Sequence, residues 1–219
     1  MQPPGGRGMG MAPDDSYVPH PLFLTHHALR IKGFAKTDAL ADITALGVDA
    51  IEKNLEALAS SGYALFREAR ALWQLTPEGR EAHREALAHD VRSLALDALG
   101  VHYRSFLDVN ELFKSLCGEW QLRHGQPNDH SDPGYDSSVI ERLVILNEHA
   151  QPIVTSMAGV VPRLSPYASR LDSTCRNVSA GSHHLFTGVM CGSFHDIWME
   201  LHEDLILTQG INRVAEGSF

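Results

Sequence analysis

The amino-acid sequence predicts a mainly α-helical protein in which one short β-hairpin interrupts the series of helices. Three observations support this fold class. Apolar residues recur three or four positions apart between residues 22 and 60, which is the period of amphipathic helices. Two short β-prone segments follow Gly62. From His89 onward the apolar residues return to helical spacing, which favours a helical bundle domain.

Three helices are expected before the hairpin. The first covers residues 22–31 and ends at Gly33, and the second covers residues 38–46, with Thr37 in position to cap it. The third helix is expected from Val48 to Ser60. Its apolar residues share one face and are Val48, Ile51, Leu55 and Leu58.

The spacing of apolar residues changes after Gly62 and predicts a β-hairpin. The hairpin consists of residues 63–66, a tip at residues 67–70, and residues 71–75. Thr76 can cap the next helix, and Pro77 suits the first turn, where a missing backbone N–H costs nothing. This fourth helix is expected to run from Pro77 into the region of Ala88.

The order helix, helix, turn, helix, hairpin, helix is that of a winged helix-turn-helix domain. Residues Ala39 to Arg84 resemble the DNA-binding domain of MarR-type bacterial regulators. The matching features are the helix-turn-helix around Gly47, the exit from the third helix at Leu58…Gly62-Tyr63, and the run Leu75-Thr76-Pro77-Glu78-Gly79. The segment that the resemblance describes is confined to the N-terminal third of the chain.

The resemblance implies that the third helix enters the major groove of DNA with its N-terminal half. There Lys53 suits a phosphate or a guanine, and Asn54 suits an adenine. The hairpin tip offers Arg67 and Arg70 to the minor groove or the DNA backbone. The expected DNA-binding residues are Lys36, Thr37, Lys53, Asn54, Arg67 and Arg70.

The net charge of the predicted winged helix does not favour DNA binding. Residues 20–90 contain eight Lys and Arg against ten Asp and Glu, a net charge of −2, and the whole chain has a formal net charge of −9. Asp49 and Glu52 lie on the expected reading helix and would repel phosphate. This charge favours an alternative function, in which the winged helix binds a protein instead of DNA.

The remainder of the chain is expected to form a helical bundle. Its predicted helices cover residues 91–99, 101–122, 136 or 137 to 158, 165–179 and 187–209. A polar loop is expected at residues 126–135, and Pro152 is expected to kink or break the third of these helices.

The predicted organisation is a disordered tail at residues 1–19, a winged-helix DNA-binding domain at 20–90, and a helical dimerisation and effector-binding domain at 91–219. The resulting function is a ligand-responsive transcriptional regulator that binds double-stranded DNA as a homodimer. Apolar walls with a few polar groups suit an effector site. The expected ligand-binding residues are Trp120, Arg163, Phe194 and Trp198.

Thirteen histidines raise a third possibility, a metal-dependent sensor or enzyme built on the bundle. His195 and His202 are seven residues apart on one helix face, with Asp196 and Glu200 between them. The ExxH pairs of carboxylate-bridged di-iron bundles are absent, however, and each histidine is better explained as a surface or core residue. We therefore expect no metal and no cofactor.

The three cysteines, Cys117, Cys175 and Cys191, form no CxxC pair and are expected to be small buried residues in helices. A thiolate–imidazole pair of Cys191 and His195 is weakly supported, and the sequence has no GxSxG, P-loop or GxGxxG motif, so no catalytic residue is expected. No run of about 18 apolar residues is present, and Met1 to Asp15 does not read as a secretory signal. The expected location is the cytoplasm.

Overall fold

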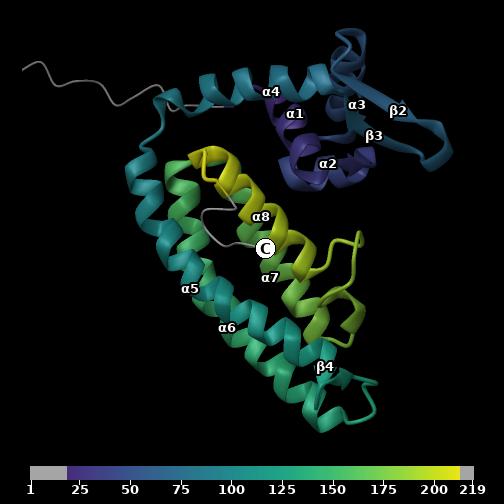
Figure 1. The fold of residues 1–219 in the computed structure, drawn as a ribbon, viewed down its shortest axis with the longest axis vertical. Coiled ribbons are helices and arrows are strands. Elements are labelled where there is room, and N and C mark those ends of the chain that lie inside the picture. The colour runs from purple at the N-terminus through teal and green to yellow at the C-terminus, as the bar shows by residue number, and fades with distance from the viewer. Residues whose placement is uncertain (1–18, 213–219) are drawn as a thin grey trace, which may run out of the picture.

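The described part of the chain, residues 19–212, is mainly helical, with 74% of its residues in helices and a small antiparallel sheet. The computed structural model describes residues 19–212, so the predicted tail lies outside the described residues except for Pro19. The described part contains eight α-helices (Figure 1). The prediction of a mainly helical fold with a small β-sheet is confirmed. None of these helices is both long enough and apolar enough to cross a membrane.

Residues 19–90, which we call the N-terminal unit, alternate helices with a small sheet. Its elements are α1 (Pro21–Lys32), β1 (Phe34–Ala35), α2 (Thr37–Thr44), α3 (Val48–Ser60), β2 (Ala64–Arg67), β3 (Leu72–Leu75) and α4 (Pro77–Asp90). The strands form one antiparallel sheet in the order β1-β3-β2. The sequence analysis missed β1, because a two-residue strand is too short to show alternation.

The structure at the start of α4 shows why a threonine occurs at position 76 and a glycine at position 79. The Thr76 hydroxyl oxygen accepts a hydrogen bond from the Gly79 backbone N–H at 2.9 Å and donates to the carbonyl of Gly62 at 2.7 Å. Thr76 therefore caps α4 and ties it to the end of α3. A Cβ atom at position 79 would lie 1.9 Å from the carbonyl oxygen of Tyr63, so only glycine lets α4 approach β2 this closely.

Gly79→Ala is expected to destabilise the protein by about 1–3 kcal/mol, because backbone must move to admit the methyl group. Gly118→Ala is the matched control, since Gly118 lies inside a helix with nothing within 4 Å of an added Cβ. That control should stabilise by about 0.5–1 kcal/mol. Urea denaturation of both variants measures the two changes, and an unchanged midpoint for Gly79→Ala would contradict the close contact.

Four long helices make up the second part, which we call the C-terminal helices. They are α5 (Leu96–Gln121), α6 (Pro133–Val160), α7 (Ser165–Ser179) and α8 (Phe194–Gln209). Figure 1 shows α5 and α6 running side by side, with α7 and α8 beside them and α4 leading across from the N-terminal unit. A two-stranded hairpin, β4 (Leu122–Arg123) and β5 (Gln126–Pro127), joins α5 to α6.

Several boundaries differ from the sequence prediction. The helix expected at residues 91–99 is a short 3-10 turn at Val91–Ser93, and α5 begins only at Leu96. The expected loop at residues 126–135 contains β5 and the first residues of α6. Pro133 suits the first turn of a helix, and the Asp132 carboxylate caps it by accepting from Gly134 and Tyr135.

Of the two outcomes predicted for Pro152, a kink or a break, the break does not occur, since α6 continues from Pro133 to Val160. Buried apolar residues lie on both sides of the proline, among them Leu146 and Val154. Helix α6 packs against α5 and α7, and this tertiary packing outweighs the lost hydrogen bond.

The last helix begins later than predicted, at Phe194 instead of residue 187. Ser193 caps α8 by accepting from the Asp196 backbone N–H at 3.0 Å. Just before it, Met190 and Gly192 have φ angles of +57° and +72°, which a helix excludes. Exposed Cys191 therefore lies in a turn, which contradicts its predicted burial in a helix, whereas Cys117 and Cys175 are buried in helices as expected.

A connected cluster of buried apolar side chains runs through both parts of the described chain. The N-terminal unit contacts the C-terminal helices mainly through α1 against α8 and α2 against α7. This contact leaves α3 and the β2–β3 hairpin on the outside of the molecule, where Figure 1 shows the hairpin projecting away from the C-terminal helices.

Candidate functional site

Helix α3 presents one face to solvent. It packs against α1, α2 and β2 through Ile51, Leu55 and Leu58, which are buried. The opposite face carries exposed charged residues, namely Asp49, Glu52, Lys53 and Glu56. The apolar side of α3 is therefore packed against the rest of the N-terminal unit, and its charged side is exposed and accessible to a binding partner.

The β2–β3 hairpin stands beside α3. Its strands pair antiparallel from Ala64 opposite Leu75 to Arg67 opposite Leu72, and a 3-10 turn at Glu68–Arg70 forms the tip. Arg67 and Arg70 are both exposed there. The structure thus brings the two arginines to the projecting end of the hairpin, as the sequence pattern predicts.

The other sequence-predicted DNA-binding residues differ in their surroundings. Lys36 is exposed and Thr37 half-buried at the start of α2. The Asn54 side-chain amide donates to the carbonyl of Pro21 at 3.1 Å and to the Thr25 hydroxyl at 2.9 Å. Asn54 therefore braces α3 against α1, and it would have to give up these bonds to read a base.

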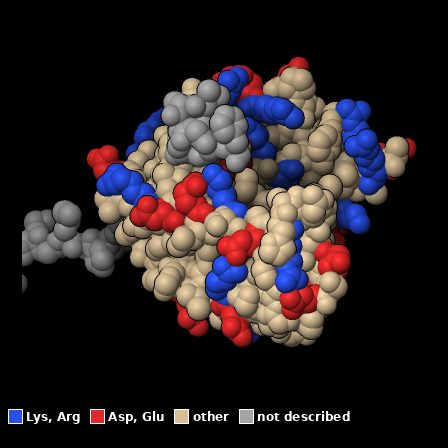
Figure 2. All heavy atoms as spheres, turned by 60° about the horizontal axis from the view of Figure 1, so that its bottom comes forward, with Lys and Arg blue, Asp and Glu red and all other residues tan. Residues whose placement is uncertain are grey.

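The outward face around α2, α3 and the hairpin has more acidic than basic residues. Its exposed cations are Lys36, Lys53, Arg67 and Arg70. Its exposed anions are Asp38, Asp42, Asp49, Glu52, Glu56 and Glu68. More generally, Lys and Arg are interspersed with Asp and Glu on the face in Figure 2.

A buried polar network joins the N-terminal unit to the C-terminal helices. We call it the junction network, and its members are His27, His83, Asp90, Arg163, Asp204 and Thr208. They come from α1, α4, the turn before α7, and α8. Each is at most 7% exposed, so the network is largely shielded from bulk water.

His27 occupies the centre of the network. Its Nε2 lies 2.9 Å from Asp204 Oδ1, and its Nδ1 lies 2.8 Å from Nε2 of His83. Burial lowers the pKa of His27, and burial with the neighbouring imidazoles lowers the pKa of His83 to about 2. With both rings neutral, His83 donates from Nε2 to His27, and His27 donates from Nε2 to the Asp204 carboxylate.

Arg163 links the two acidic residues of the network. It donates to Asp90 Oδ2 at 2.5 Å and to Asp204 Oδ1 at 3.3 Å, and it also bonds the Thr208 hydroxyl. Burial opposes ionisation of Asp204, but Arg163 and the hydrogen bonds from His27 and Thr208 outweigh it and lower its pKa. For Asp90, burial dominates and raises the pKa to about 6.

A second set of ion pairs borders the same contact between α1 and α8. Glu200, nearly buried, accepts from Lys32 at 2.6 Å and from Arg170 at 2.8 Å. Glu203 accepts from Arg30 at 3.3 Å. The N-terminal unit is therefore positioned on the C-terminal helices by specific charged contacts in addition to apolar packing.

The four predicted ligand-binding residues do not come together as a pocket wall. Trp120, Phe194 and Trp198 are at most 5% exposed in the apolar core, and the indole N–H of Trp198 donates to Asn110 at 2.9 Å. Arg163 is committed to the junction network. These aromatic residues pack on one another because helical spacing on facing helices produces a core as readily as a pocket.

The histidines and cysteines singled out by the sequence lie apart. His202 is buried with its Nε2 3.2 Å from the Tyr103 hydroxyl, whereas half-buried His195 lies against the Phe113 ring. Burial raises the pKa of Cys117 to about 12 and that of Cys175 to about 11, which disfavours their thiolates. Within residues 19–212, no group of three or more His, Cys, Asp or Glu is placed to hold a metal ion.

Sequence reasoning missed the junction network, although α4 carries a local signal. Gly79, His83, Leu87 and Asp90 recur at helical spacing and are all buried. A histidine and an aspartate on the buried face of a helix indicate polar partners elsewhere in the fold, because buried polar groups are almost always hydrogen-bonded. The identity of those partners was not readable from the spacing.

Comparison of the chain with protein-family models, with curated proteins and with solved structures found no match.

Proposed function

We propose that this protein is a winged-helix transcriptional regulator that binds double-stranded DNA through α3 and the β2–β3 hairpin. One observation carries the proposal: α3 is braced on its apolar side, open on its charged side, and flanked by a hairpin with two exposed arginines at its tip. A DNA-reading winged helix needs this geometry, because the helix enters the major groove while the wing contacts the adjacent backbone or minor groove.

The element order supports the same proposal. The sheet order β1-β3-β2, with α2 and α3 between β1 and β2, is the arrangement that winged helix-turn-helix domains use. The third strand, β1, adds to the features on which the sequence resemblance rests. It pairs Phe34 and Ala35 with Gln74 and Trp73, which fixes the base of the hairpin beside α1.

The charge of the outward face sets the expected strength of DNA binding. Among the residues that the structure describes, Lys36, Lys53, Arg67 and Arg70 are the exposed cations on that face and the candidates for phosphate contacts. Four phosphate contacts give a slope of about −4 for log K against log salt concentration, a modest value for a DNA-binding unit. Specificity must then come largely from the fit of α3, and we expect tight binding only when two copies act together.

A homodimer would supply two reading helices. Exposed apolar residues Val101 and Leu112 lie eleven residues, about three turns, apart on one face of α5. Exposed Arg104, Ser105 and Asp108 lie between them, so these two residues do not form a continuous apolar stripe. We propose self-association through the C-terminal helices because it would supply two reading helices and leave both hairpins free. Sedimentation of the full chain at micromolar concentration tests this part of the proposal.

The arginine pair at the hairpin tip gives the sharpest test of DNA binding. The double variant Arg67→Ala/Arg70→Ala should weaken binding to a duplex from the promoter region of its own gene and reduce the magnitude of the salt slope by about 2 for each subunit. The control is Arg142→Ala/Arg176→Ala, which removes two exposed positive charges from α6 and α7. Fluorescence anisotropy over a range of salt concentrations measures both, and equal losses in the two variants would contradict the proposal.

A specific observation favours a second candidate function, the binding of a protein with a basic surface. Asp49, Glu52 and Glu56 lie on the exposed face of α3, where they would repel phosphate. If α3 reads DNA, Asp49→Asn/Glu52→Gln should strengthen DNA binding several-fold. If instead the wild type and this variant both show no salt-sensitive, sequence-specific binding, the protein-binding function is the better account.

A further inference from the structure

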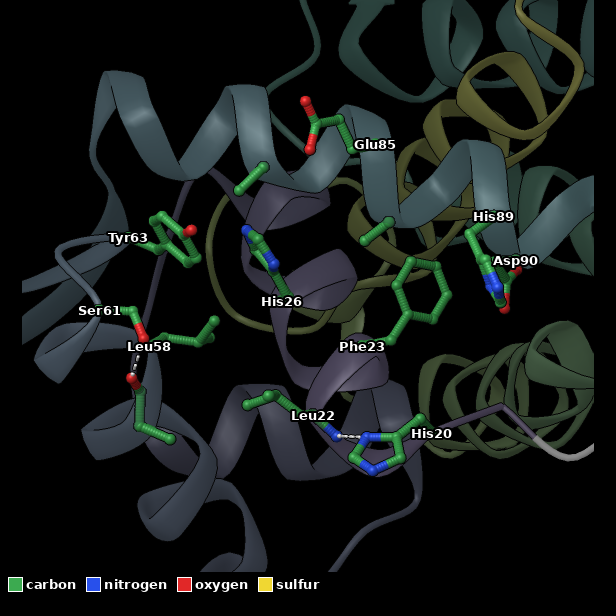
Figure 3. A pocket seen from close by; sticks show the side chains of 13 residues that line it. His20, Leu22, Phe23, His26, Leu58, Ser61, Tyr63, Glu85, His89 and Asp90 are labelled. Carbon is green, nitrogen blue, oxygen red and sulfur yellow. Dashed lines mark hydrogen bonds between the residues drawn. The ribbon is translucent and has the colours of Figure 1, made fainter.

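A cavity of about 640 Å³ lies between α1, α3 and α4. Figure 3 shows Phe23 and His26 reaching into it from α1, with Tyr63 facing His26. The rings of His26 and Tyr63 are nearly parallel, with 10° between their planes and 6.2 Å between their centroids. Leu58 of α3 completes an apolar wall. The cavity therefore has the size and the aromatic surface of a site for a small planar molecule.

The charged groups around this cavity are acidic. Glu85 and Asp90 line it, and no Lys or Arg within residues 19–212 is among its lining residues. The His26 Nε2 lies 2.8 Å from the Gly79 carbonyl oxygen, which can only accept, so Nε2 carries a proton. Burial lowers the pKa of His26 and keeps its ring neutral, which leaves Nδ1 as an acceptor. These groups together favour a ligand that donates hydrogen bonds and carries positive charge.

The junction network behind the cavity lacks a positive charge. Asp90 and Asp204 supply two carboxylates, whereas Arg163 is the network's one permanently charged cation. His27 and His83 do not supply the missing positive charge, because burial lowers their pKa values. A cation placed at the cavity end of Asp90 would balance this cluster, since two carboxylates in one buried site repel each other.

From this geometry we propose that the cavity binds a planar aromatic molecule that carries a protonated amine. The aromatic part lies among Phe23, His26 and Tyr63, and the amine lies toward the α4 wall, which carries Glu85 and Asp90. Phe23 also lies under the Arg163 guanidinium, 5.8 Å from its ring centroid, so the ligand ring and Arg163 share one aromatic neighbour.

Occupation of the cavity would act on two parts of the molecule. A ligand amine at Asp90 shares this carboxylate with Arg163 and supplies the second positive charge of the junction network. The ligand ring contacts Leu58 and so presses on the end of α3. This regulatory consequence rests on the proposed DNA-binding function. Binding of the ligand to the cavity is independent of that function.

Isothermal titration calorimetry of the full chain tests the site with three probes of similar shape. The probes are tryptamine, which is cationic, 3-ethylindole, which is neutral, and indole-3-propionate, which is anionic. We expect tryptamine to bind about tenfold more tightly than indole-3-propionate, with 3-ethylindole between them. Equal affinities, or no binding of tryptamine at millimolar concentration, would overturn the proposal.

Two variants locate the charge recognition. Glu85→Gln and Asp90→Asn should each weaken tryptamine binding several-fold and leave 3-ethylindole unaffected. Glu85 is exposed, so its replacement leaves the fold intact even if Asp90→Asn destabilises the junction. The control Glu81→Gln removes a carboxylate from the same helix outside the cavity. Tryptamine affinities that are the same in Glu85→Gln as in Glu81→Gln would contradict the assigned site.

The DNA experiment separates the two hypotheses. If tryptamine binds as described and also lowers the affinity for DNA, both the site and its regulatory consequence are supported. If tryptamine binds but the affinity for DNA does not change, the regulatory consequence is overturned and the site stands. If the protein binds no DNA at all, the proposed function fails while calorimetry still decides the ligand site.

Discussion

Arg163→Ala is expected to destabilise the protein by about 3–5 kcal/mol, a large share of the total stability of a typical domain. Arg163 is buried and donates to both Asp90 and Asp204. Its removal leaves two carboxylates facing each other away from water. The loss is large because the remaining charges cannot be solvated, whereas the net stabilisation from an intact buried ion pair is small.

The expected loss is measured by urea denaturation followed by circular dichroism. Arg176→Ala serves as the control, because Arg176 pairs with Asp172 at an exposed site on α7, where a pair contributes about 0–1 kcal/mol. The double variant Arg163→Met/Asp90→Asn should recover part of the stability, since it removes one of the two stranded charges. Equal losses in Arg163→Ala and Arg176→Ala would mean that the junction network is not closed to water.

The free energy of unfolding is expected to fall as the pH is lowered below about 6.5, the ordinary pKa of histidine. His26, His27 and His83 all have pKa values lowered by burial in the folded protein. Between the two pKa values of each group, the unfolded chain binds a proton that the folded chain excludes. Stability contributed by these residues is therefore complete above pH 6.5 and is lost progressively in acid.

Asp90 changes the free energy of unfolding in the opposite direction as the pH is lowered. Burial raises its pKa to about 6, so the folded protein binds this proton more readily than the unfolded chain as the pH falls from 6. Each group contributes up to about 1.4 kcal/mol per pH unit, so His27 and His83 together outweigh Asp90. We expect a net slope of at least about 1.4 kcal/mol per pH unit between pH 6 and pH 5.

Urea denaturation at half-unit intervals from pH 8 to pH 5 measures this slope. His83→Gln should reduce it by removing one of the buried imidazoles, although the variant also lowers the overall stability. His149→Gln changes an exposed histidine on α6 and provides the matched control. Stability that is constant over this range, or that rises toward pH 5, would show that the imidazoles of the junction network are accessible to solvent protons in the folded state.

Local sequence signals identified most of the secondary structure. Thr76 and Pro77 marked the start of α4, and the change of spacing after Gly62 marked the β2–β3 hairpin. These features are readable because capping and amphipathic periodicity depend on residues a few positions apart. The arginines at the hairpin tip were placed correctly for the same reason, since a tip is set by the strands on either side of it.

The errors in the sequence analysis came where distant parts of the chain decide local structure. Pro152 does not break α6, because α5 and α7 hold the helix on both sides of it. The sequence suggests Asn54 as a base-reading residue but does not show that its amide is bonded to α1, which only the packing of α1 on α3 reveals. Trp198 and Phe194 looked equally suited to a pocket or a core until the neighbouring helices were in place.

The sequence alone determined most of the helices, the place of the β2–β3 hairpin and the charged residues that the third helix presents, because periodicity and capping are short-range effects. Only the tertiary structure decided that His27 meets Asp204, 177 residues away, and that Arg163 joins Asp204 to Asp90. Such partners are chosen by the packing of whole helices, and no local pattern encodes which buried polar groups will satisfy one another.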